Sequence, residues 1–180
     1  MLRITVPGDE FFNEVENQFF TQGDFVLELE HSLVALSKWE SKYEKPFLGK
    51  GDKTREETLG YIEAMCLTPD VPPDVFHRLS KENFDEINNY IGAKMSATWF
   101  SEVHKSPKNH EIITSELIYY WMFSLNVPIE CENWHLSRLF TLLRVFNVKN
   151  DKPKKMSRSE IAARNRELNA QRKQQLGTTG

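Results

Sequence analysis

Histidine, cysteine and glutamate residues could bind a metal ion at two places in this 180-residue chain. Cys131 and His135 are four residues apart, a spacing that can put two ligands on one helical face. A structural zinc site takes four ligands and no second Cys/His pair stands nearby, so the pattern favours a buried cysteine and a histidine at a helix start. His104, His110 and Glu111 fall in a polar stretch that is typical of a solvated loop. We therefore predict no metal site and no cofactor.

Phosphate-binding and nucleophilic motifs are missing from the sequence. Residues 49–54 (GKGDKT) lack the spacing of a phosphate-binding loop and follow a Pro-Phe-Leu turn rather than a strand. The motif G-x-S-x-G is absent, and no serine or cysteine has an obvious base as its partner. We therefore predict that the protein is not an enzyme.

Charge divides the chain into two parts whose net charges have opposite signs. The net charge of the whole chain is −3, but residues 149–180 contain nine Lys/Arg and three Asp/Glu, a net charge of +6. Residues 1–148 contain fourteen Lys/Arg and twenty-three Asp/Glu, a net charge of −9. This distribution predicts one acidic globular domain over residues 1–148 and a basic tail over residues 149–180.

Composition restricts where the protein works. No apolar run approaches the ~20 residues that span a bilayer, and the first residues lack the apolar stretch of a secretory signal. Two cysteines are too few for a disulfide framework. We therefore predict a cytoplasmic protein with no membrane role.

The domain is predicted to be mainly α (α+β), with a small β-ribbon packed on helices. Residues 2–6 and 25–29 have the pattern of strands, and a polar connection over residues 9–24 would join them into an antiparallel ribbon. Apolar residues at three- and four-residue spacing from Leu29 predict a helix from His31 to Tyr43.

Capping signals predict two further helices in the domain. Thr54 with Glu57 forms a capping box that opens a helix ending before Pro69, and Ser80 opens a helix through Tyr90. Residues 112–125 are apolar nearly all round, which predicts a central buried helix, and another helix is predicted over residues 133–146. Residues 92–100 are either extended or irregular, and residues 101–110 have the composition of a surface loop.

The basic tail is predicted to contain a helix that follows a linker. Residues 157–160 form a capping box, with Met156 and Ile161 as its hydrophobic staple, and a helix follows from Arg158 to Lys173. This helix is too poor in apolar residues to bury much by itself, so we expect it to order against a partner. It lacks the aromatic residues that nucleic-acid stacking or membrane-surface binding would use.

Exposed aromatic residues and tail arginines are the candidate partner-binding residues. Residues 39–48 and 98–100 are rich in aromatics, which belong to the core in most proteins but form a protein-binding patch where they are exposed together. The candidates are Trp39, Phe47, Trp99, Arg158, Arg164, Arg166 and Arg172.

Three stretches resemble the tail assembly chaperones of long-tailed (siphovirus-like) phages and prophages. They are residues 29–48 (LEHSLVALSKWESKYEKPFL), residues 112–122 (IITSELIYYWM) and residues 164–173 (RNRELNAQRK). The resemblance implies a non-enzymatic protein in the cytoplasm of the infected bacterial host. Its partners would be the tape-measure protein and other tail proteins, and it would assist tail-tube assembly. The resemblance also implies self-association.

The same sequence features are compatible with two other functions. A virion structural protein, such as a tail or connector component, would have the same lack of catalytic motifs. A nucleic-acid-binding protein would use the basic tail, although the charge of the tail is the only feature in favour of this function.

Overall fold

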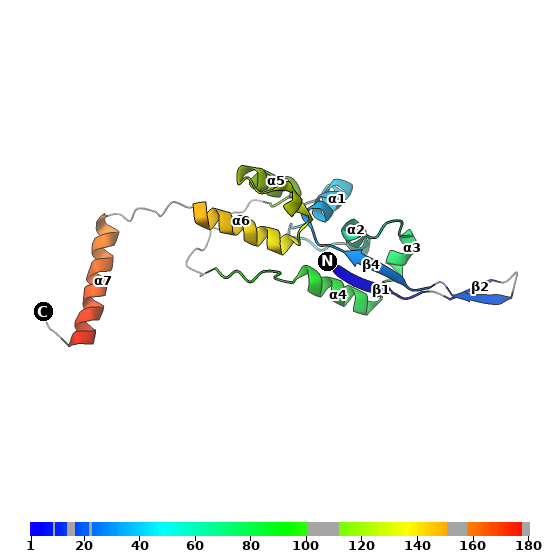
Figure 1. Cartoon of the computed structure of the whole chain (residues 1–180), viewed down its shortest axis with the longest axis horizontal. Coiled ribbons are helices and arrows are strands. Elements are labelled where there is room, and N and C mark those ends of the chain that lie inside the picture. The colour runs from blue at the N-terminus through cyan, green and yellow to red at the C-terminus, as the bar shows by residue number, and fades with distance from the viewer. Residues whose placement is uncertain (9, 14–16, 22, 101–111, 151–157, 178–180) are drawn as a thin grey trace. The chain divides into compact units, whose positions relative to one another are not determined.

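The computed structural model describes residues 1–8, 10–13, 17–21, 23–100, 112–150 and 158–177 (Figure 1). The fold is mainly helical with a small antiparallel sheet at the N-terminus, as the sequence predicted. The chain divides into two compact units, Met1–Phe146 and Asn147–Gly180. The predicted division fell two residues later, inside helix α6 (Leu136–Asn150). Among the described residues, no helix has both the length and the apolar content that crossing a membrane requires.

The predicted ribbon is confirmed. Strands β1 (Leu2–Val6) and β4 (Phe25–Leu29) pair antiparallel, from Leu2 opposite Leu29 to Val6 opposite Phe25. Alternate side chains point to the same face of a strand, so one face of the ribbon is apolar and packs on the helices. Its buried residues are Ile4, Val6, Leu27 and Leu29.

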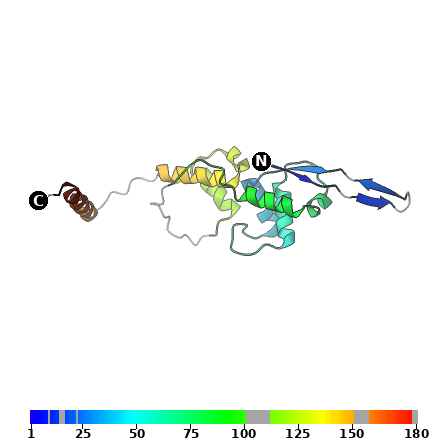
Figure 2. The same cartoon turned by 90° about the horizontal axis from the view of Figure 1, so that it is seen from below.

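A second hairpin lies between these strands, where we had predicted a polar connection without strands. Strands β2 (Glu10–Asn13) and β3 (Gln18–Thr21) pair antiparallel as a separate two-stranded sheet (Figure 2). The prediction was wrong because phenylalanines occur here in adjacent pairs, at residues 11–12 and 19–20. Adjacent pairs remove the apolar–polar alternation by which a strand is recognised.

Helix α1 (Leu33–Tyr43) begins two residues later than predicted. Ser32 is its N-cap, and the Ser32 hydroxyl accepts a hydrogen bond from the backbone N–H of Ala35 at 3.2 Å. Leu29, which fits the helical spacing, belongs to β4 instead. The helix ends at Glu44, whose φ of 54° is left-handed.

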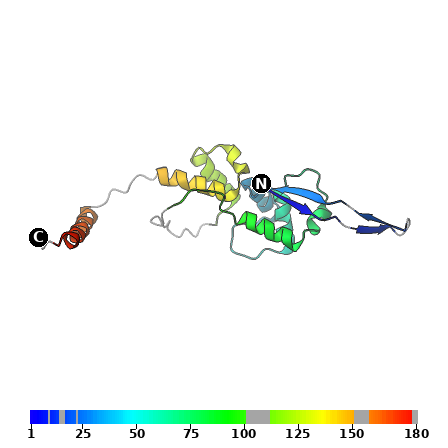
Figure 3. The same ribbon diagram turned by 60° about the horizontal axis from the view of Figure 1, so that its bottom comes forward.

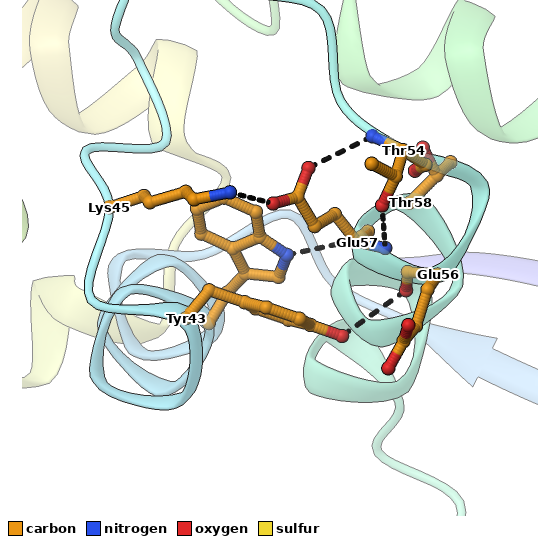
Figure 4. A network of polar contacts seen from close by, with 7 residues as sticks. Tyr43, Lys45, Thr54, Glu56, Glu57 and Thr58 are labelled. Atoms are coloured by element: carbon orange, nitrogen blue, oxygen red, sulfur yellow. Dashed lines mark hydrogen bonds and ion pairs between the residues drawn. The ribbon is translucent and has the colours of Figure 1, made fainter.

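Helix α2 (Arg55–Met65) begins with the predicted capping box at Thr54, and helix α4 (Lys81–Ile91) begins after Ser80, as predicted. The Thr54 hydroxyl accepts from the N–H of Glu57 at 3.2 Å, and the Glu57 carboxylate accepts from the N–H of Thr54 at 2.9 Å (Figure 4). The Ser80 hydroxyl caps α4 in the same way. A short helix, α3 (Pro73–His77), was not predicted because one turn is too short to show a period.

The prediction of a central buried helix was wrong, because that helix is only partly buried. Helix α5 (Ser115–Ser124) buries only Ser115, Ile118 and Met122. A 3₁₀ helix, η1 (Ile129–Asn133), follows it, and α6 begins at Leu136 rather than at residue 133. Residues 93–100 form neither helix nor strand, and the predicted loop at 101–110 lies outside the described residues.

Two hydrophobic cores share α1. Helices α4 (green) and α6 (yellow), which belong to different cores, are both seen in Figure 3. The first core packs the β1–β4 ribbon against α1, α2, α3 and α4, and α1 contributes Ala35 and Trp39 to it. The second core packs α1 against α5, η1 and α6, and α1 contributes Leu33 and Leu36. These two pairs lie on different sides of the helix, so α1 is enclosed from both directions.

The predicted tail helix is present as α7 (Arg158–Leu176), and every side chain of it that the structure describes is exposed. Ser157, Met156 and the side chain of Glu160 lie outside the described residues, so the predicted capping box and staple stay predictions.

Candidate protein-binding surface

The N-terminus of α5 is fixed to α1 by one buried carboxylate. Glu40 on α1 is 8% exposed, and its carboxylate accepts two backbone hydrogen bonds. One comes from the N–H of Ser115 at 2.7 Å and the other from the N–H of Phe47 at 2.8 Å. A carboxylate at the first turn of a helix also interacts favourably with the helix dipole. Glu40 therefore anchors the first residue of α5 to α1.

The outward side of α5 is aromatic. Glu116, Tyr120 and Phe123 follow one another at four- and three-residue spacing, so they form one stripe along the helix. Tyr120 is 64% exposed and Phe123 is 63% exposed. The ring of Tyr119 stacks against that of Phe123, with the two centroids 6.4 Å apart. Large apolar side chains exposed together are typical of a surface that binds another protein.

Glutamates border this aromatic stripe. The Tyr119 hydroxyl donates a hydrogen bond to the Glu132 carboxylate at 2.8 Å, and partial burial together with this bond raises the pKa of Tyr119. Hydrogen bonds from its own backbone N–H and from Thr114 lower the pKa of Glu116. The carboxylate of Glu116 is therefore charged at neutral pH. Residues 112–134 contain three glutamates and no lysine, arginine or histidine. We call Glu116, Tyr119, Tyr120, Phe123 and Glu132 together the α5 surface.

One of the predicted partner-binding residues belongs to the core, and a second packs against it. Trp39 is 2% exposed, and its indole N–H donates to the carbonyl of Glu57 at 2.7 Å. The ring of Phe47 stacks on that of Tyr61 at 3.8 Å and is only partly exposed. The burial of Trp39 contradicts the prediction that it contacts a partner, because the loop after α1 folds back and places Phe47 against it. That Phe47 contacts a partner stays a prediction.

Trp99 is the one predicted aromatic that the structure leaves exposed, at 87%. It lines an open pocket of about 340 Å³ together with Lys94, Phe100 and Arg144. The ammonium group of Lys94 lies 4.4 Å from the centroid of the Trp99 ring, and the guanidinium of Arg144 lies 4.0 Å from that of Phe100. Both cations are thus already engaged with aromatic rings.

The four predicted arginines, at positions 158, 164, 166 and 172, are all exposed on α7. At about 100° per residue they are distributed around the helix rather than gathered on one face. The guanidinium of Arg166 donates to the carbonyl of Ala162 one turn earlier, at 3.3 Å. Arginines distributed in this way favour diffuse electrostatic contact over binding through one basic face.

The predicted weak metal pair, Cys131 and His135, does not lie on one helix. Cys131 belongs to η1, whereas His135 precedes α6 and faces His31, with ring centroids 5.0 Å apart. His135 is hydrogen-bonded through Nε2 to the carbonyl of Tyr90 at 3.0 Å. Within the part of the chain that the structure describes, no group of three or more potential ligands gathers. His104, His110 and Glu111 lie outside that part.

Sequence reasoning assigned no role to His31, yet it is 5% exposed and joins the two cores. Its Nδ1 is hydrogen-bonded to the hydroxyl of Tyr61 at 2.7 Å. Burial, with His135 nearby, lowers the pKa of His31 to about 4, so the ring is neutral at pH 7. No spacing rule would have found this pair, because a β-bridge between Ser32 and His135 brings the two segments together.

Comparison with known proteins returned no match to any family model, any curated protein or any solved structure.

Proposed function

We propose that the protein is a non-enzymatic tail assembly chaperone of a long-tailed phage. It would act in the cytoplasm of the infected bacterium, where it holds apolar helical segments of the tape-measure protein until tail-tube subunits assemble around them. The α5 surface is the observation that carries this proposal. A rigid helix that displays two aromatic side chains to solvent can cover an apolar stripe on another helix.

The location of the resembling stretches supports the proposal. Residues 29–48 include α1, and residues 112–122 include most of α5. Glu40 connects these two helices through its bond to Ser115. Two of the three resembling stretches therefore include the helix that displays the surface and the helix that contacts it, and the third lies on α7.

Co-expression with the tape-measure protein tests the proposal. This partner would be a very long helical protein encoded beside this chain, and we expect it to stay soluble only when the chain is present. Substitution of Tyr120→Ser together with Phe123→Ser should remove the effect. Leu67→Ser is the matched control, because Leu67 is also exposed, at 56%, but lies outside the α5 surface.

Two results would contradict the chaperone function. One is a tape-measure protein whose solubility is the same with and without this chain. The other is recovery of the chain in purified virions in stoichiometric amounts, which would indicate a structural component instead.

A further inference from the structure

The α5 surface has a defined length and a defined charge. From Glu116 to Phe123 it covers two helical turns, about 10 Å at 1.5 Å per residue. Glu116 lies one turn before Tyr120, and Glu132 is held beside Tyr119 by the hydrogen bond between them. One carboxylate therefore precedes the aromatic groups along the helix, and the other is bonded to one of them.

Among the described residues, no neighbouring basic group is paired with these carboxylates. The nearest basic group along the chain after residue 134 is His135, which is buried, and then Arg138, whose guanidinium lies 3.9 Å from the centroid of the Trp134 ring. Before residue 112, the last lysine of the described chain is Lys94, which lies over Trp99. Within the described ranges, no ion pair to Glu116 or Glu132 is present.

We propose that the α5 surface binds an amphipathic helix in which lysine or arginine flanks the apolar stripe. The apolar stripe of that helix covers Tyr120 and Phe123, and its cationic flanks lie against Glu116 and Glu132. This inference rests on the proposed function and adds to it the chemistry of the bound segment. Charge complementarity of this kind selects one partner over another and speeds association more than it adds affinity.

A partner helix with acidic flanks is the alternative that the surface disfavours. Each of its carboxylates would lie near Glu116 or Glu132 without a cation between them, and like charges brought together in an interface suppress binding. The preference should weaken as salt is added, because exposed charges are screened over about 8–10 Å at physiological ionic strength.

Two fluorescein-labelled model peptides test the inference by fluorescence anisotropy with the full chain. Both are 18-residue helices with the same leucine stripe, and their flanks are lysine in one and glutamate in the other. We expect the lysine peptide to bind, and to lose affinity when the salt concentration is raised. The glutamate peptide should bind at least roughly fivefold more weakly at low salt.

Glu116→Lys is the decisive variant, and Glu82→Lys is its matched control. Both glutamates occupy the second position of a helix, both are exposed, and hydrogen bonds lower the pKa of both. Glu116→Lys should lower the affinity for the lysine peptide roughly fivefold and raise the affinity for the glutamate peptide. Glu82→Lys changes the net charge equally but lies on α4, so it should change neither affinity appreciably.

The outcomes separate this inference from the proposed function. Equal weakening by Glu82→Lys and Glu116→Lys would mean that the acidic body attracts the peptide as a whole, and would overturn the inference. The two peptides could instead bind equally well, with binding of both lost in Phe123→Ser. This result would overturn the charge preference and leave the chaperone function standing. Selective binding that depends on Glu116, with a tape-measure protein that stays insoluble, would support the surface and refute the function.

Discussion

Helices α1 and α5 are packed against each other, yet their burial is the reverse of what their sequences indicate. Helix α5 has seven apolar residues out of ten, and α1 has six out of eleven. Helix α1 nevertheless buries five residues and α5 buries three. The difference comes from position, because α1 lies between two cores and α5 lies on one side of the second. An apolar helix at the edge of a fold keeps side chains that only a partner can cover.

Trp39→Ala should have the largest effect on stability, because it removes the largest side chain that α1 buries. We expect the free energy of unfolding to fall by about 3–5 kcal/mol, as for other buried aromatic residues. Chemical denaturation measures the change. Trp99→Ala is the control, since an 87% exposed side chain should contribute almost nothing. Equal effects of the two variants would contradict the assignment of Trp39 to the core.

Glu40→Ala should have the next largest effect, because it disconnects α5 from α1. Two backbone N–H groups, those of Phe47 and Ser115, would lose their acceptor, which costs about 2–4 kcal/mol in total. Faster hydrogen exchange at the Ser115 amide would locate the damage at the start of α5. An unchanged exchange rate at that amide would show that Glu40 does not hold α5.

Acidification should weaken the junction of the two cores. The pKa of His31 is about 4 in the folded protein and about 6.5 in an unfolded chain, so the unfolded state binds the proton first. Stability is complete above pH 6.5 and is lost as the pH falls towards 4, with a loss of about 2 kcal/mol by pH 5. Denaturation at pH 7 and at pH 5 measures this loss. In His31→Gln the loss over this interval should shrink, whatever the stability of the variant at pH 7.

Phe123→Ser should have the smallest effect on stability. It should show most clearly that the exposed face of α5 serves binding, whereas the buried residues of α1 serve stability. Phe123 is 63% exposed, so we expect the free energy of unfolding to change by no more than about 0.5 kcal/mol. The same substitution should abolish binding of the lysine-flanked peptide. A loss of stability as large as that of Trp39→Ala would mean that the aromatic stripe belongs to the core.

Local signals in the sequence predicted much of the fold. The ribbon follows from the alternation in residues 2–6 and 25–29. The capping box at Thr54 and the cap at Ser80 mark the starts of α2 and α4 within one residue. These signals work because the atoms that satisfy the backbone are only three residues away. The start of α1 was predicted less well. Apolar residues at helical spacing continue back to Leu29, so the spacing did not reveal that Ser32 is the N-cap.

The candidate site could not be predicted in the same way. The hydrophobicity of α5 indicates that the helix favours burial. It does not indicate whether residues of the same chain or of a partner protein bury it. Trp39 and Trp99 lie in similar aromatic stretches, and only the tertiary contacts of Trp39 distinguish the two. The approach of His31 to His135 depends on a pairing between segments about a hundred residues apart, which no local pattern encodes.

The position of α1 between the two cores also determines how the first unit comes apart. Each core takes two of its buried residues from α1, so neither can lose this helix without exposing its own interior. The two halves therefore cannot melt one after the other as independent domains do. A unit built in this way unfolds in a single cooperative transition, and its calorimetric and van't Hoff enthalpies should agree.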